Sequence, residues 1–194
     1  MMSLPKFDPR TIALSLLILL LAAVRVVFCL GLQHSPMSNF STVEAMALFG
    51  GAYFNNWTKA FLFPLLTLWL SDLLLNRFLY YHEWRWFFEG FYWTYGAFAL
   101  MVITGTLMIK KVTPKNILSA SAIVVLIHWM ITDLGVWIDG TMYPKTLFGW
   151  WACLVAAIPF EINILGATLL YSALFFGLFQ WMTRRYPKIA VMLH

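Results

Sequence analysis

Residues 39–72, NFSTVEAMALFGGAYFNNWTKAFLFPLLTLWLSD, decide how the rest of this chain folds. A polar turn leads into a short helix rich in small residues, and two asparagines then turn the chain back into an apolar run that ends at Asp72. The predicted helical hairpin brings Glu44 and Asp72 near the same end, just inside a hydrophobic layer. A carboxylate is costly inside a membrane and usually serves a function there. We expect the remaining helices to form a frame around that end.

The composition is that of an integral membrane protein. Of the 194 residues, 62% are hydrophobic and only 11% are charged, and the mean hydropathy is +0.79. Ordinary soluble domains carry about 25% charged residues. A spanning helix needs about 20 residues, so the chain has room for about six helices with short loops. The sequence therefore predicts one all-α, polytopic domain over residues 1–194, with the lipid bilayer as its surroundings.

Several classes of function are disfavoured by what the sequence lacks. The net charge of +5 is spread over loops, and no basic patch interleaved with aromatic residues predicts nucleic-acid binding. Two cysteines inside apolar runs make neither a disulfide framework nor a CxxC metal site. Zinc-protease, hydrolase, Walker and Rossmann motifs are not found, so we expect neither an enzyme nor a cofactor. Active transport would then draw its energy from partner subunits or from a gradient.

The apolar segments predict six helices, two of them of unusual length. The second is too short to cross a bilayer alone, but its Ala47-x-x-x-Gly51 spacing permits close helix contact. The last is too long for one span, and Pro159 is expected to divide it into a short outer segment, a kink and the sixth helix. The expected ranges are 11–32, 42–55, 59–76, 89–109, 116–138 and 147–183.

The basic residues predict the orientation, because cytoplasmic loops of membrane proteins carry an excess of Lys and Arg. With the N-terminus inside and six crossings, three basic residues face outward, namely Arg77, Arg85 and Lys145, and Arg25 lies within the membrane. The cytoplasmic ones are Lys6, Arg10, Lys59, Lys110, Lys111, Lys115, Arg184, Arg185 and Lys188. The bias predicts that both termini are cytoplasmic.

In this topology the intramembrane acids all lie in the outer half of the membrane, and His128 lies one to two turns deeper than Asp133. Such a set predicts a cavity that is open to the outside, under a lid of loop aromatics. An excess of acids favours a cationic or donor-rich small molecule. The predicted substrate-binding residues are Arg25, Asn39, Glu44, Asp72, Tyr81, His82, Asp133, Tyr143, Glu161 and Asn163.

Each of these residues also has a purely structural interpretation. Arg25 with one carboxylate can be an ion pair that exists because buried charges need partners. Asp72 can end its helix as a cap, and Asp133 can lie at the interface. His128 can be a hydrogen-bonded core histidine, and the cysteines can pack as small apolar groups. If all the polar residues pair with each other and leave no cavity, a structural or assembly subunit of a larger membrane complex is the better interpretation.

Four segments carry a resemblance to a known family: NFSTVEAMALFGGAYF, FPLLTLWLSDLLLN, LGVWIDGTMYPKTLFGWWACLVAAIPF and EINILGATLLYSALFFG. They resemble a family of small bacterial membrane proteins without an assigned function. That family is similar to the substrate-binding (S) components of energy-coupling factor (ECF) vitamin transporters. The resemblance implies six helices, cytoplasmic termini, an inner-membrane location, and a pocket closed by outer loops. It also implies uptake of a small vitamin or micronutrient, with a transmembrane coupling subunit and ATPases as partners.

The solitary cobalamin-transporting S components are similar in size, so the resemblance leaves a corrinoid open as the substrate. In those proteins a cysteine near the outer surface contacts the cobalt. The outer loops here contain no cysteine, so His82, Cys153 or Cys29 would have to take that role. No other metal is expected. The weakest alternative is an intramembrane enzyme that uses Asp133 and His128 with a metal.

Overall fold

The fold comes from a computed structural model, which describes residues 9–31, 40–54, 56–186 and 189. The described chain is entirely helical, without strands. Five of its helices are long and apolar enough to cross a membrane, with α3 and the π-helical turn η1 counted as one span. The elements are α1 (Pro9–Gly31), α2 (Val43–Tyr53), α3 (Trp57–Leu75), η1 (Asn76–Tyr80), α4 (Phe91–Met108), α5 (Pro114–Asp139) and α6 (Leu147–Arg185).

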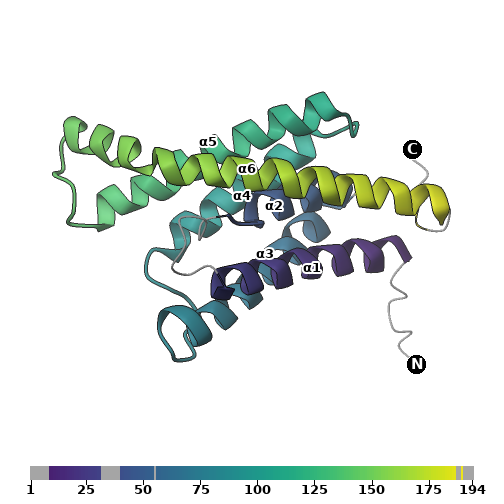
Figure 1. Cartoon of the computed structure of the whole chain (residues 1–194), viewed down its shortest axis with the longest axis horizontal. Helices are drawn as coiled ribbons and strands as arrows, with labels where there is room; N and C mark the ends of the chain where they lie inside the picture. The colour runs from purple at the N-terminus through teal and green to yellow at the C-terminus, as the bar shows by residue number, and fades with distance from the viewer. Residues whose placement is uncertain (1–8, 32–39, 55, 187–188, 190–194) are drawn as a thin grey trace.

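Helix α1 begins and α6 ends at the same end of the bundle (Figure 1). We call this the terminal end. The opposite end carries the connections α3–α4 and α5–α6, and we call it the loop end (Figure 1). Helix α1 therefore begins and α6 ends on the same side of the described bundle. That this side is cytoplasmic stays a prediction from the basic residues.

Helix α2 is the centre of the bundle and contacts each of the five other α-helices. The Thr42 hydroxyl donates to the Leu21 carbonyl (2.9 Å), halfway along α1, and the Arg10 guanidinium donates to the Tyr53 carbonyl (2.6 Å). Helix α2 thus lies beside only the terminal half of α1. Ten of its eleven residues are buried, which explains why its sequence is apolar on every side. A short helix that starts level with the middle of α1 is the feature around which the long helices pack.

Small residues let α2 and α4 approach until their backbones touch. A Cβ atom added to Gly51 would lie 2.2 Å from the Val102 carbonyl oxygen, and one added to Gly105 would lie 2.7 Å from the Leu48 carbonyl oxygen. The Thr106 hydroxyl donates to the Gly51 carbonyl across the same contact (2.9 Å). Gly51 thus makes the close contact predicted for it, and α2 is held in register against α4.

The prediction of a separate segment before Pro159 is wrong, and the predicted kink at Pro159 stays a prediction. Residues 147–158 form the first turns of α6, which runs unbroken for 39 residues with Pro159 inside it (Figure 1). A proline costs one backbone hydrogen bond, but membrane helices tolerate it where neighbouring groups satisfy the freed carbonyl. At 1.5 Å per residue α6 is about 58 Å long, far more than the roughly 30 Å of a hydrocarbon layer. Helix α6 must therefore tilt or project from the bilayer.

Candidate functional site

A complete ion pair joins α1 to α3 in the loop-end half of the bundle. Arg25 Nη1 lies 2.6 Å from Asp72 Oδ1, and it also donates to Ser71 Oγ (2.5 Å). The Tyr95 hydroxyl on α4 donates to the other carboxylate oxygen, Asp72 Oδ2 (2.8 Å). Both side chains of the pair are nearly buried, 13% and 6% exposed. We call Arg25, Ser71, Asp72 and Tyr95 the arginine centre; each charge in it has a partner.

A second group of titratable side chains comes from α2, α5 and α6. His128 Nδ1 lies 3.0 Å from Glu161 Oε1. Glu44 interacts electrostatically with His128, Glu161 and Arg25. Asp133 interacts in the same way with Glu161 and His128. We call Glu44, His128, Asp133 and Glu161 the acid centre. It holds three carboxyl groups and one imidazole.

Half of the oxygens in the acid centre lack partners. Glu44 is 1% exposed and Glu161 is 8% exposed. Glu44 Oε2, Asp133 Oδ2 and Glu161 Oε2 are sealed from solvent and accept no hydrogen bond from the described residues. An unsatisfied buried acceptor costs about 1–3 kcal/mol, and more when it is charged. The unpartnered oxygens of the acid centre therefore lower the stability of the folded protein, whereas the charges of the arginine centre all have partners.

Two members of the acid centre, Glu44 and His128, lie near the middle of the bundle along its length. Glu44 lies in the first turn of α2, which starts level with the middle of α1, and His128 lies near the middle of α5. The N-terminus of a helix stabilises a nearby anion by about 0.3–1 kcal/mol. A charge near the bilayer centre costs at least about 2.5–3.5 kcal/mol. The N-terminus of α2 alone cannot keep a carboxylate at that depth.

The remaining predicted site residues are spread over the loop end. Tyr81 lies with its ring 4.2 Å from the Arg85 guanidinium, and His82 is an exposed loop residue with φ of 59°. Tyr143 is half-buried in the α5–α6 connection, and Asn163 is half-buried on α6. Asn39 lies outside the described residues. The structure thus brings Arg25 to Asp72 and Glu161 to His128. Tyr81 contacts Arg85, and the His82 carbonyl accepts a hydrogen bond from Arg77.

A cavity of about 440 Å³ opens at the loop end between α4 and α5. Its polar wall consists of Glu89, Thr94, Thr132 and Asp139, and the indole of Trp93 lies among them. Asp139 Oδ2 accepts hydrogen bonds from the Tyr92 hydroxyl (2.5 Å) and from Trp93 Nε1 (2.8 Å). Thr132 adjoins Asp133 in sequence, and its hydroxyl donates to the His128 carbonyl (2.8 Å). Thr132 is thus the wall residue that is next to the acid centre in sequence, whereas the side chains of Glu44, His128, Asp133 and Glu161 are not part of this wall.

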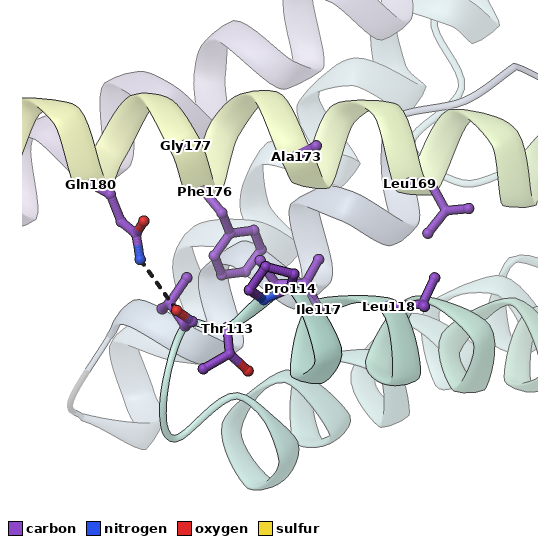
Figure 2. A pocket seen from close by; sticks show the side chains of 10 residues that line it. Thr113, Pro114, Ile117, Leu118, Leu169, Ala173, Phe176, Gly177 and Gln180 are labelled. Atoms are coloured by element: carbon purple, nitrogen blue, oxygen red, sulfur yellow. Dashed lines mark hydrogen bonds between the residues drawn. The ribbon is translucent and has the colours of Figure 1, made fainter.

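Other cavities lie along the surfaces of the helices. A cavity of about 290 Å³ between α5 and α6 has Glu161 in a mostly apolar wall with Trp129. A cavity of about 440 Å³ lies at the terminal end between the start of α5 and α6 (Figure 2). Its wall is largely apolar, and Gln180 Nε2 donates to the Val112 carbonyl at its edge (3.4 Å; Figure 2). The loop-end cavity is the one with two acids in its wall.

The sequence missed several polar members of these sites. Tyr95, which completes the arginine centre, was not predicted; a hydroxyl inside an apolar span was the signal that could have indicated it. Glu89, Thr94 and Thr132 of the loop-end cavity carry no pattern that separates them from ordinary helix-end residues. Cys29 is half-buried on α1 and Cys153 is buried on α6, both free. Among the described residues, no three His, Cys, Asp or Glu side chains are placed to hold a metal ion together.

The fold and the buried polar groups define an all-helical protein that passes through the membrane several times. A model of one protein family, described as "Family of unknown function (DUF6580)", matches residues 5–189. The chain belongs to this family. No curated protein and no solved structure matches the chain.

Proposed function

We propose that this protein binds a small solute at the loop end and takes part in its uptake across the bacterial inner membrane. The observation that carries the proposal is an excess of buried acid beside a cavity. Three carboxyl groups of the acid centre share one imidazole, and the adjoining cavity has two further acids in its wall. A purely structural polar core has no reason to hold unmatched acids, because each one lowers stability.

The size and chemistry of the cavity narrow the solute. Ligand sites in proteins have volumes of about 300–1,000 Å³, and the loop-end cavity, at about 440 Å³, falls near the lower limit. Glu89 and Asp139 favour a cation or a molecule with several hydrogen-bond donors, and Trp93 offers a ring for stacking or for cation–π contact. A vitamin or micronutrient of one or two rings suits this cavity better than a corrinoid, which is larger.

The path of the solute follows from the neighbours of the cavity. A solute held by Asp139 and Glu89 lies next to Thr132, and the acid centre lies one turn deeper on α5. The likeness to S components of ECF transporters supports this proposal and implies a coupling subunit with ATPases as the partner.

A structural or assembly subunit is the second candidate. The complete pairing of the arginine centre favours it, and so do the exposed apolar residues at the start of α6. Leu147 and Phe148 are 80% and 81% exposed, and Trp151 is 64% exposed. In a larger complex these side chains would be covered by another protein rather than by lipid.

Thermal unfolding in detergent against a panel of vitamins and small amines separates the two candidates. A solute present at a hundred times its dissociation constant stabilises a protein by about 2.7 kcal/mol. We expect such a shift for at least one cationic or donor-rich member, and we expect Asp139→Asn to reduce it. Glu83→Gln, in the exposed outer loop, is the matched control and should keep the shift. Stable copurification with a fixed partner, without a shift for any member of the panel, would favour the structural candidate.

A further inference from the structure

The acid centre has more negative charge than its surroundings can balance. If every acid were ionised, one imidazolium would face three carboxylates and leave two negative charges. The nearest other cation, Arg25, is already paired with Asp72. Cys153 on α6, whose thiol donates to the Asp133 carbonyl, carries no positive charge. Neutrality of this core therefore requires two further positive charges.

The unpartnered oxygens indicate what supplies those charges. Glu44 Oε2, Asp133 Oδ2 and Glu161 Oε2 are each sealed from solvent, although the Glu161 side chain also lines the apolar cavity between α5 and α6. A proton needs no cavity and no shell of ligands. It turns a carboxylate oxygen into a hydroxyl, which removes the charge and can donate to a neighbouring acceptor. We propose that the acid centre is a proton-binding site that holds two protons at neutral pH and exchanges them as the bundle opens.

Further buried polar groups without partners in the described chain, all of them hydroxyls, lie between the acid centre and the terminal end. Ser121 precedes His128 by two turns of α5, Ser172 follows Glu161 by three turns of α6, and Tyr53 is at the far end of α2 from Glu44. All three hydroxyls are buried without a hydrogen-bond partner among the described residues. Each can bond to water when the helices separate. These hydroxyls lie on the side of the acid centre that faces the terminal end.

The inference rests on the proposed uptake function and names its driving ion. On the loop-end side a carboxylate takes a proton from hydronium and releases water. On the terminal side the same carboxyl group gives its proton to water and becomes a carboxylate again. Solute binding beside Thr132 would change the surroundings of Asp133 and would thereby couple the transport of the solute to the transfer of the proton. The proton gradient would then supply the energy, in place of the ATPases that the likeness to S components implies.

Infrared spectroscopy of the full chain in nanodiscs of ether-linked lipids tests the site directly, because such lipids lack ester carbonyls that would mask the signal. At neutral pH we expect carbonyl bands of protonated carboxyl groups. Glu44→Gln and Asp133→Asn should each remove one band, and the double variant should remove both. Glu89→Gln, at the exposed loop end, is the matched control and should remove none. A spectrum without protonated-carboxyl bands at neutral pH would overturn the proposal.

A second measurement keeps the proposal testable if a variant fails to fold. A native state that holds more protons than the unfolded state loses stability as pH rises. The melting temperature of the wild-type protein should therefore fall from neutral to alkaline pH, and the fall should be smaller for Asp133→Asn. A melting temperature that rises over this range would contradict a protonated core. Neither measurement uses a solute. A negative result here would therefore contradict the proton-binding site alone, whereas a negative result with the ligand panel would contradict solute binding.

Discussion

The arginine centre and the acid centre lie in the same bundle and solve the problem of buried charge in opposite ways. In the arginine centre one cation meets one carboxylate, and Tyr95 and Ser71 occupy further hydrogen-bonding positions. In the acid centre three carboxyl groups share His128, and three of their oxygens have no partner among the described residues. The first arrangement holds helices together. The second lowers stability and therefore needs a functional reason to persist.

Breaking the arginine centre should have the largest effect. Arg25→Ala leaves the Asp72 carboxylate buried without its cation, and removal of one partner of a buried pair typically costs about 3–5 kcal/mol. Denaturant unfolding in detergent measures the loss. The double variant Arg25→Met with Asp72→Leu removes both charges, and we expect it to recover most of the stability. A single variant as stable as the wild-type protein would mean that the pair does not hold α1 to α3.

Removing one hydrogen bond from the same centre should cost less. Tyr95→Phe deletes the hydroxyl that donates to Asp72 Oδ2, and hydrogen bonds to charged groups contribute about 1.5–3 kcal/mol. Tyr92→Phe is the matched control, because the Tyr92 hydroxyl bonds to Asp139 at the exposed end of α5. We expect the control to change the free energy of unfolding much less, because the Tyr92 hydroxyl is exposed to solvent. Equal losses for both variants would show that burial does not distinguish them.

The acid centre can also be disturbed without changing any of its residues. Gly51→Ala places a Cβ atom 2.2 Å from the Val102 carbonyl oxygen and forces α2 away from α4, and overpacking of this kind costs about 1–3 kcal/mol. Because α2 also carries Glu44, the variant should weaken solute binding as well as stability. Gly96→Ala, with no atom within 4 Å of the added Cβ, is the control on α4 and should be neutral. A neutral Gly51→Ala would contradict the close packing of α2 and α4.

The sequence predicted the parts of the fold that depend on hydrophobic length. Every predicted helix is present within a few residues, and the short second helix, which is too small to span alone, lies where the small-residue pattern predicts close packing. Pro159 was misread because a proline breaks a helix only where no neighbour compensates, and the packing of α5 against α6 is not visible in sequence. The match to a family of unknown function confirms the coarse resemblance and leaves the likeness to S components a proposal.

The division of the acids between two centres could not be predicted. Sequence placed Arg25, Glu44, Asp72, Asp133 and Glu161 at similar depth but gave no rotation of one helix about another. Only the packed structure shows that Arg25 pairs with Asp72, and that His128, first interpreted as a core histidine, pairs with Glu161. The sequence predicted one cavity lined by all of the intramembrane acids. The structure instead divides these acids between two neighbouring centres.

The most direct test neutralises one carboxyl group in each centre without changing its shape. Asp72→Asn and Glu44→Gln are compared by thermal unfolding at neutral pH, in the same detergent and on the same day. We expect Asp72→Asn to lose several kcal/mol, because Arg25 is left as an unpaired buried cation, and Glu44→Gln to lose almost nothing, because its amide replaces an already neutral acid. Equal losses, or a larger loss for Glu44→Gln, would contradict the distinction between a structural ion pair and a proton-holding site.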